Sequence, residues 1–198
     1  MIEALVRQTR TVRRFVEQKA VETPLLRAWV DLARLGGSAR NAQALKYMII
    51  TEAALRAQLF PLLGWAGCLP DWPGPGPGER PPAYIVCLLD DALARGPETE
   101  AHFDLGVATQ NLLLGAAAHG VFGCRIGAFS AEKVQRLLGL EDRFRVLLVL
   151  ALGYPAETVV VEEMRPEGDI RYWRDEQGVH HVPKRSLAEV LVSPPAPK

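Results

Sequence analysis

The sequence predicts an α+β fold in a single domain, and three observations lead to this prediction. Helical and strand patterns mix along the chain without the regular βαβ alternation of a Rossmann layout. The 198 residues suffice for one well-buried core, and no internal repeat divides them. Hydrophobic residues make up 48% and charged residues 23%, with no long apolar run, so the composition indicates an ordinary globular protein and excludes membrane-spanning and disordered classes.

The helices are predicted from amphipathic or apolar runs and their end signals. Thr23 and Pro24 are expected to open a helix as N-cap and first helical residue, and Gly36-Gly37 to end it. The longest helix is expected over residues 102–119, with Asp104 as its N-cap. Its sides are nearly all apolar or small, so we expect it to be buried in the core or against another subunit. Further helices are expected over 53–63 and 130–138, and a final short segment over 186–192.

Strands are predicted where apolar and β-branched residues run between turn signals, over 45–51, 83–89 and 145–152. A hairpin is expected from 170–173 and 179–182 around Gln177-Gly178. The domain is expected to span residues 1–193, followed by a frayed, proline-rich tail over 194–198.

Charge and cysteine content exclude several classes of function. The 23 basic and 23 acidic residues balance, so no sustained nucleic-acid track is expected. Cys68, Cys87 and Cys124 are widely spaced and odd in number, which favours reduced thiols over a disulfide framework or a zinc site. The first residues also lack the basic region of a secretory signal, so we expect a cytoplasmic protein. His180 and His181 alternate along a strand and should point apart, so no metal site is expected.

Four segments carry candidate binding chemistry, and three of them have a plainer alternative. Arg10-Thr11-x-Arg13 offers two guanidiniums and a hydroxyl to a phosphate, or is a solvated basic turn. The segment 38–43 offers amides and hydroxyls to the edge of a heteroaromatic ring, or simply connects a helix to a strand. Glycines in 120–129 permit close backbone approach to a ligand. Lys184-Arg185 is a late basic pair that closes onto an anion or lies in solvent.

The loop over residues 64–82 is the longest stretch without predicted structure. Its segment 73–78 alternates proline and glycine, and because proline has no N–H this segment should not cradle a phosphate. Trp65 and Trp72 either wall a substrate pocket or pack plainly. Loops of this length are commonly functional.

Taken in order, the motifs resemble those of the FMN-dependent nitroreductase family over nearly the whole chain. The family's opening Arg-Ser-x-Arg-(Arg/Lys)-Phe is matched by residues 10–15, and its Pro-Ser-Ala-x-Asn-x-Gln-Pro by residues 37–44. Its Asp-x-Gly-x-Ala-x-Gln-Asn-Leu helix is matched from Asp104 to Leu112. Later matches are Cys-x-Ile-Gly-Ala-Phe at 124–129, Ala-Leu-Gly-Tyr-Pro at 151–155 and Arg-x-Leu at 185–187. The sequence departs from the second motif at Gly37 and Ala44, which replace two prolines.

The resemblance implies a nitroreductase-like fold, with a central, mostly antiparallel sheet flanked by helices, in an intertwined homodimer. It implies that the phosphate of FMN is held by Arg10, Thr11, Lys184 and Arg185, and that Arg13 lies near N1 and O2 of the ring, where a fixed cation favours the reduced flavin. The ring and ribityl chain would be met by Ser38, Asn41 and Gln43, often from the second subunit, by backbone groups of Ile126, Gly127 and Ala128, and at close range by Gly153.

The implied activity is that of an oxidoreductase that takes hydride from NADH or NADPH and reduces nitroaromatic, quinone or related small acceptors by a ping-pong mechanism. No catalytic side chain is required, which agrees with the lack of a convincing nucleophile or acid–base pair in the sequence. Two alternatives stay open: a relative with other flavin chemistry, such as a reductive dehalogenase or a flavin-destroying oxidase, and a flavin- or nucleotide-binding protein without turnover.

Overall fold

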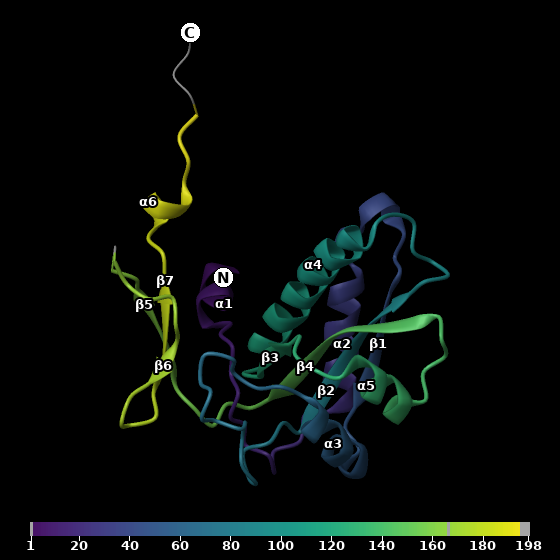
Figure 1. The fold of residues 1–198 in the computed structure, drawn as a ribbon, viewed down its shortest axis with the longest axis horizontal. Helices are drawn as coiled ribbons and strands as arrows, with labels where there is room; N and C mark the ends of the chain where they lie inside the picture. The colour runs from purple at the N-terminus through teal and green to yellow at the C-terminus, as the bar shows by residue number, and fades with distance from the viewer. Residues whose placement is uncertain (1, 166, 195–198) are drawn as a thin grey trace.

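The computed structural model describes residues 2–165 and 167–194, so residues 195–198 of the predicted tail lie outside the described part of the chain. Figure 1 shows the course of the chain. The elements in chain order are α1 (Ile2–Gln8), α2 (Thr23–Arg34), η1 (Ala39–Asn41), β1 (Leu45–Ile50), α3 (Ala53–Leu59), η2 (Phe60–Leu62), β2 (Ala83–Asp90), α4 (Glu98–Ala117), β3 (Phe122–Ile126), α5 (Ala131–Leu138), β4 (Phe144–Gly153), β5 (Val159–Glu163), β6 (Trp173–Arg174), β7 (His180–Lys184) and α6 (Leu187–Val190).

The central sheet has four strands in the order β1-β2-β4-β3, and every neighbouring pair is antiparallel. This confirms the predicted antiparallel sheet and α+β class. Strand β2 lies inside the sheet and is buried along its whole length, which explains why its sequence is continuously apolar up to Asp90.

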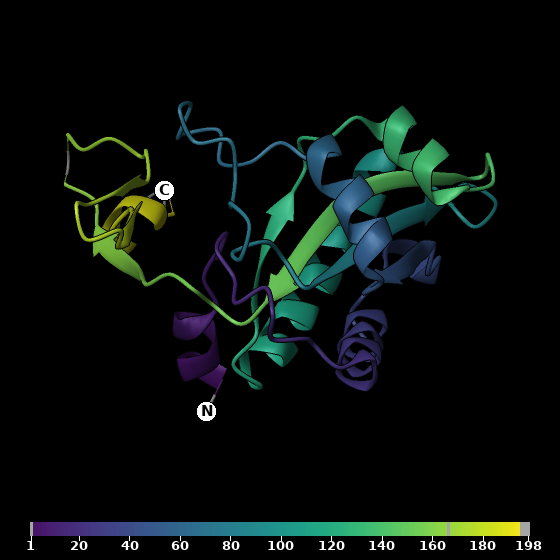
Figure 2. The same cartoon turned by 90° about the horizontal axis from the view of Figure 1, so that it is seen from below.

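Helices cover both faces of this sheet, which gives three layers (Figure 2). Along β2 the side chains alternate between the faces. Ile85 and Cys87 pack with α2 and α4 in one core cluster. Tyr84, Val86 and Leu88 pack in a second cluster, with contributions from α3 and α5.

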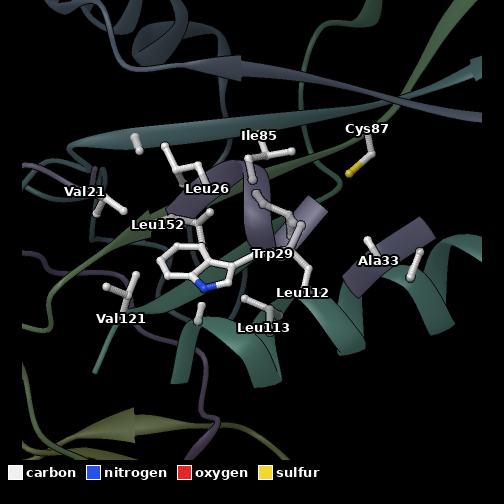
Figure 3. Packing of buried hydrophobic residues seen from close by; sticks show 14 of the residues in the cluster. Val21, Leu26, Trp29, Ala33, Ile85, Cys87, Leu112, Leu113, Val121 and Leu152 are labelled. Atoms are coloured by element: carbon white, nitrogen blue, oxygen red, sulfur yellow. The ribbon is translucent and has the colours of Figure 1, made fainter. Parts of the chain in front are cut away.

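Trp29 lies at the centre of the cluster between the sheet and the two long helices, surrounded by leucines of α4 (Figure 3). It is fully buried, and its Nε1 donates to Nδ1 of His119 at 3.4 Å. Burial of a side chain this large contributes on the order of 4–6 kcal/mol. A Cβ at Gly115 would lie 2.5 Å from a Leu32 methyl carbon, so the glycine lets α2 and α4 approach closely.

The ends of the two long helices differ from the prediction. Helix α2 has Glu22 at its N-cap, with Thr23 and Pro24 inside the first turn. Helix α4 begins at Glu98, so Asp104 lies in its second turn and the expectation of an N-cap there was wrong. Helix α4 also keeps an exposed side in the single chain, where Phe103 is 73% exposed.

The chain after β4 forms an arm that stands apart from the central sheet, with α1 lying between them (Figures 1 and 2). The arm contains α6 and a small sheet of order β5-β7-β6, in which β5 and β7 are parallel. The predicted hairpin is present as β6 and β7, with Trp173 opposite His181, but its first strand is Trp173–Arg174 rather than 170–173. Strands β3 and β5 were not predicted.

Among the helices of the described residues, none has the length and apolar character needed to cross a membrane.

Candidate functional site

A cavity of about 370 Å³ opens where the segment after α1, helix α4, strand β3 and the arm meet. Its volume lies within the range of roughly 300–1,000 Å³ that is typical of small-molecule sites. Four of its lining side chains are basic, and none of the described residues that line it is acidic. The lining consists of Val6, Thr9, Arg10, Thr11, Arg13, Gln110, Arg125, Tyr172, His180, Val182 and Lys184.

Arg10 and Thr11 reach the cavity because α1 ends at Gln8 and the chain then crosses to the sheet. Nη2 of Arg10 donates to the carbonyl of Val6 at 2.6 Å, which ties the side chain back to the helix. Thr11 forms an isolated parallel bridge with Gly123 of β3. Arg10 is therefore half-buried between α1 and the sheet, whereas Thr11 is exposed in the single chain.

Arg13 is the most buried of the four cations, with 9% of its surface exposed. Its Nη1 donates to Nε2 of His180 at 3.2 Å, and its guanidinium carbon lies 4.6 Å from the centre of the Tyr172 ring. Lys184 reaches the same cavity from β7, where residues 180, 182 and 184 alternate with outward-facing ones.

The two neighbouring histidines point in opposite directions, as predicted. His180 is fully buried beside Arg13, and burial, with the adjacent guanidiniums, lowers its pKa to about 4. His181 stacks on Trp173 on the other face, 4.1 Å between ring centres, and its bonds to Asp175 and Glu162 raise its pKa.

Three side chains of the cavity carry a buried nitrogen that has no hydrogen-bonding partner among the described residues. These nitrogens are Nε of Arg10, Nε of Arg13 and Nδ1 of His180. Because Nε2 of His180 accepts from an arginine, its Nδ1 bears the hydrogen in the neutral ring. Buried donors are normally satisfied, so three unmatched ones in a basic cavity indicate a site for a polar, negatively charged ligand. The phosphate-bearing FMN that the resemblance implies fits this donor set.

Arg125 belongs to the same cavity but was not singled out from the sequence. Its Nε donates to Oγ1 of Thr109 at 3.0 Å and its Nη2 to Oε1 of Gln110 at 2.9 Å, which fixes the side chain against α4. The signal was the alternation of buried Cys124 and Ile126 around it, which marks a strand with Arg125 on the opposite face.

The segment 38–43 is tightly held and locally strained. Arg40, Asn41 and Gln43 have φ values of 55°, 51° and 50°, a left-handed conformation that such residues rarely adopt. Ser38 donates to Oδ2 of Asp104 at 2.7 Å and accepts from the backbone N–H of Gln43 at 3.0 Å. Strain of this kind often occurs at ligand-binding segments.

The predicted ring-binding residues are not brought to the basic cavity within one chain. Ser38 and Gln43 line a separate cleft of about 320 Å³ between α2, β1 and α4, and Asn41 lines neither space. Ile126 is buried, whereas Gly127 and Ala128 are exposed at the end of β3. Gly153 is buried, and a Cβ there would lie 2.6 Å from Pro82.

Arg185, predicted to bind the phosphate, is likewise outside the lining of the cavity. Its Nη1 lies 3.4 Å from a carboxylate oxygen of Glu189 in the first turn of α6. Lys184, rather than Arg185, is the residue of this pair that faces the basic cavity.

The two tryptophans of the 64–82 loop do not line the basic cavity either. Trp65 packs against Phe60, with 5.6 Å between ring centres. Trp72 lies under the guanidinium of Arg174 at 4.2 Å, and the backbone N–H of Cys68 donates to the Tyr172 hydroxyl at 3.3 Å. The loop is therefore attached to the arm, beside Tyr172.

Comparisons with known proteins agree with this fold. Residues 79–154 match the model described as "Nitroreductase family". A protein of Archaeoglobus fulgidus named "Putative NADH dehydrogenase/NAD(P)H nitroreductase" is 26% identical over 129 residues, which are 63% of this chain and 69% of the relative. The crystal structure of a nitroreductase family protein from Streptococcus pneumoniae superimposes with a TM-score of 0.69 at 20% identity, covering 98% of this chain and all of that one.

A second solved structure, a "putative nitroreductase in complex with FMN" from Desulfovibrio desulfuricans, covers 99% of this chain and 98% of its own, with a TM-score of 0.71 and 22% identity. These solved structures establish a shared fold. The chain has the nitroreductase fold, and its residues 79–154 match the nitroreductase family model.

Proposed function

We propose that this protein is an FMN-dependent oxidoreductase that uses NADH or NADPH to reduce small acceptors such as nitroaromatics or quinones. The observation that carries the proposal is the basic cavity, with four cationic side chains, no acidic side chain among its described lining residues, and three buried nitrogens without a partner. Such a donor set favours a ligand that presents a phosphate and a polar ring edge.

Within this site, Arg10, Thr11 and Lys184 would hold the phosphate, with Arg185 at the rim. Arg13 would donate to the N1–O2 edge of the ring, and its burial strengthens its charge there because little water screens it. Gln110 and Arg125, which share a hydrogen bond, add donors on the α4 side.

A second copy of the chain would complete the site in a homodimer. Ser38, Asn41 and Gln43 lie away from the basic cavity of their own chain, so we propose that they meet the ring bound by the partner. From the sheet side, the ring would be met by Ile126, Gly127, Ala128 and Gly153. The exposed apolar side chains of α2, α4 and α6 support this arrangement, since patches of this kind mark interfaces. They include Leu32 (41% exposed), Phe103 (73%) and Leu187 (71%).

When bound, FMN would supply hydride and electron transfer between a nicotinamide donor and a small acceptor in a ping-pong sequence. The chain's residues would bind and orient both partners, with Trp65 and Trp72 at the acceptor side. The Archaeoglobus relative's name, which includes NAD(P)H nitroreductase, supports the choice of donor.

Reconstitution followed by steady-state assay tests the proposal. Purified protein is expected to bind FMN stoichiometrically, seen by quenching of flavin fluorescence and by the visible spectrum, and to oxidise NADH or NADPH with a quinone or nitroarene present. Failure to bind FMN would overturn the proposal. FMN binding without nicotinamide oxidation would favour the binding protein without turnover, and halide release from a haloaromatic substrate without nitroarene reduction would favour the dehalogenase.

A further inference from the structure

The Arg13 side chain is held by groups that do not neutralise it. Its hydrogen-bond acceptor is the neutral His180 ring at 3.2 Å. Its other close contacts are the face of Tyr172 at 4.6 Å and the thiol of Cys124, whose pKa is raised by burial. The rings of Tyr172 and His180 lie 5.2 Å apart, so Arg13, His180 and Tyr172 form one cluster at the wall of the basic cavity.

The acid that contacts the Arg13 backbone, Glu157, is occupied by other donors. The side chain of Glu157 is almost fully buried; its Oε2 accepts from Nη2 of Arg174 at 2.9 Å, and its Oε1 accepts from the backbone N–H groups of Arg13 and Arg14. Glu157 therefore fixes the backbone at Arg13 but pairs with the charge of Arg174. No ion pair is formed between the Arg13 guanidinium and a described carboxylate.

This arrangement is unusual on energetic grounds, because a buried cation without a counter-ion costs several kcal/mol. An acid at position 180 would be the simplest partner for Arg13, and the imidazole there satisfies one N–H without cancelling the charge. The cost is offset when an anionic group of a ligand occupies the cavity.

We propose that His180 and Tyr172 are positioning residues that hold Arg13 as an uncompensated cation, so that its full charge acts on the ring edge of bound FMN. This inference rests on the proposed function. It means that two residues of the arm help to set how strongly the site stabilises the reduced flavin. Tyr172 also accepts from Cys68 in the 64–82 loop, so the same side chain links Arg13 to that loop.

The isosteric pair His180→Gln and His180→Glu separates charge from shape. Both side chains can accept from Arg13, and only the glutamate neutralises it. With the FMN-loaded protein, His180→Glu is expected to weaken sulfite addition to the flavin about tenfold or more relative to His180→Gln, and to lower the midpoint potential by about 30 mV for each factor of ten in the stability of the reduced form. The affinity for oxidised FMN, whose ring is neutral, should differ much less between the two variants.

Equal sulfite affinities and potentials in the glutamine and glutamate variants would overturn the inference, as would a loss of affinity that is equal for oxidised and reduced FMN. Circular dichroism establishes that each variant is folded.

A second measurement on the wild-type protein without FMN covers the case in which His180→Glu does not fold. The ¹⁵N NMR signals of the His180 ring should report a neutral imidazole with the hydrogen on Nδ1 between pH 6 and 8, because burial and the cations of Arg13, Arg174 and His181 oppose its protonation and outweigh the carboxylate of Glu157. A protonated ring, or hydrogen on Nε2, in this range would overturn the inference. This NMR measurement needs no FMN, so its result is separate from any failure of the wild-type protein to bind FMN. Such a failure would contradict the proposed function instead.

Discussion

Ser38 donates its hydroxyl hydrogen to Oδ2 of Asp104 at 2.7 Å, and Oδ1 of the same carboxylate accepts from the backbone N–H of Ala39 at 2.8 Å. A single side chain on the second turn of α4 thus fixes the start of the strained segment 38–43. Because three residues of this segment adopt the left-handed conformation, each at a cost of about 1–3 kcal/mol, the segment depends on such anchors to keep its shape.

Asp104→Ala is expected to release this segment. The Ser38 hydroxyl and the Ala39 N–H would lose their acceptor, with a loss of about 1–3 kcal/mol in the free energy of unfolding. FMN affinity should fall roughly tenfold or more, as each 1.4 kcal/mol of lost binding energy is a factor of ten. Denaturant unfolding and fluorescence titration measure the two effects. Asp31→Ala, which removes an exposed carboxylate paired with Arg34, is the matched control, and equal FMN affinity in both variants would contradict the prediction.

Arg10→Ala is expected to lower FMN affinity while leaving the oligomeric state unchanged. A hydrogen bond to a charged group contributes about 1.5–3 kcal/mol, so the dissociation constant should rise by a factor of roughly 10–150. The dependence of affinity on salt should also weaken in the variant, since one cation is lost. Arg7→Ala on α1, whose exposed side chain pairs with Glu3, should bind FMN like the wild type. An unchanged dissociation constant for Arg10→Ala would remove Arg10 from the phosphate site.

The sequence predicted the fold class and most central elements because their patterns are local. The apolar run of β2 and the glycine-bounded helix α2 carry their own signals of type and extent. Strand β5 was missed because its residues are half-exposed and its parallel partner β7 lies more than a dozen residues later, so that its pattern is weak without the pairing.

The candidate site was predicted unevenly for the same reason. Arg10, Thr11, Arg13 and Lys184 were identified because they belong to motifs, and they do converge on one cavity. Arg125 was missed because strand β3, which carries it, was not predicted. Tyr172 and His180 were missed as cavity residues because their place depends on how the arm folds back toward α1 and β3. That contact joins residues 167 positions apart, as between Arg13 and His180, and no local pattern indicates it.

The buried His180 predicts a stability loss on moderate acidification. Its pKa is lowered from 6.5 to about 4, so between these values the unfolded chain binds a proton that the folded protein does not. Unfolding is therefore favoured as the pH falls from 6.5 towards 4, by up to about 1.4 kcal/mol per pH unit from this group.

The measurement is the free energy of unfolding against pH for the wild type and His180→Gln, whose difference isolates this residue from the carboxylates that titrate nearby. His181, with its raised pKa, acts in the opposite sense and above pH 6.5, where its stabilising pairs are lost as the pH rises through its folded pKa. Parallel curves for the two proteins between pH 4 and 6.5 would show that His180 does not titrate as argued.

Phe103→Asp tests whether the exposed side of α4 is the interface that completes the site. Phe103 is 73% exposed in the single chain, so in a monomer this substitution should change the free energy of unfolding by less than about 0.5 kcal/mol. If α4 packs against a second copy, each dimer would bury two carboxylates without partners, and dissociation should be seen by sedimentation at micromolar concentration. FMN affinity should fall with it, because Ser38, Asn41 and Gln43 would no longer reach the partner's flavin.

Ala131→Asp adds the same charge to the exposed first turn of α5, in the layer on the other side of the sheet, and should leave the assembly and FMN binding unchanged. A Phe103→Asp protein that keeps both the assembly and the affinity of the wild type would place the interface elsewhere.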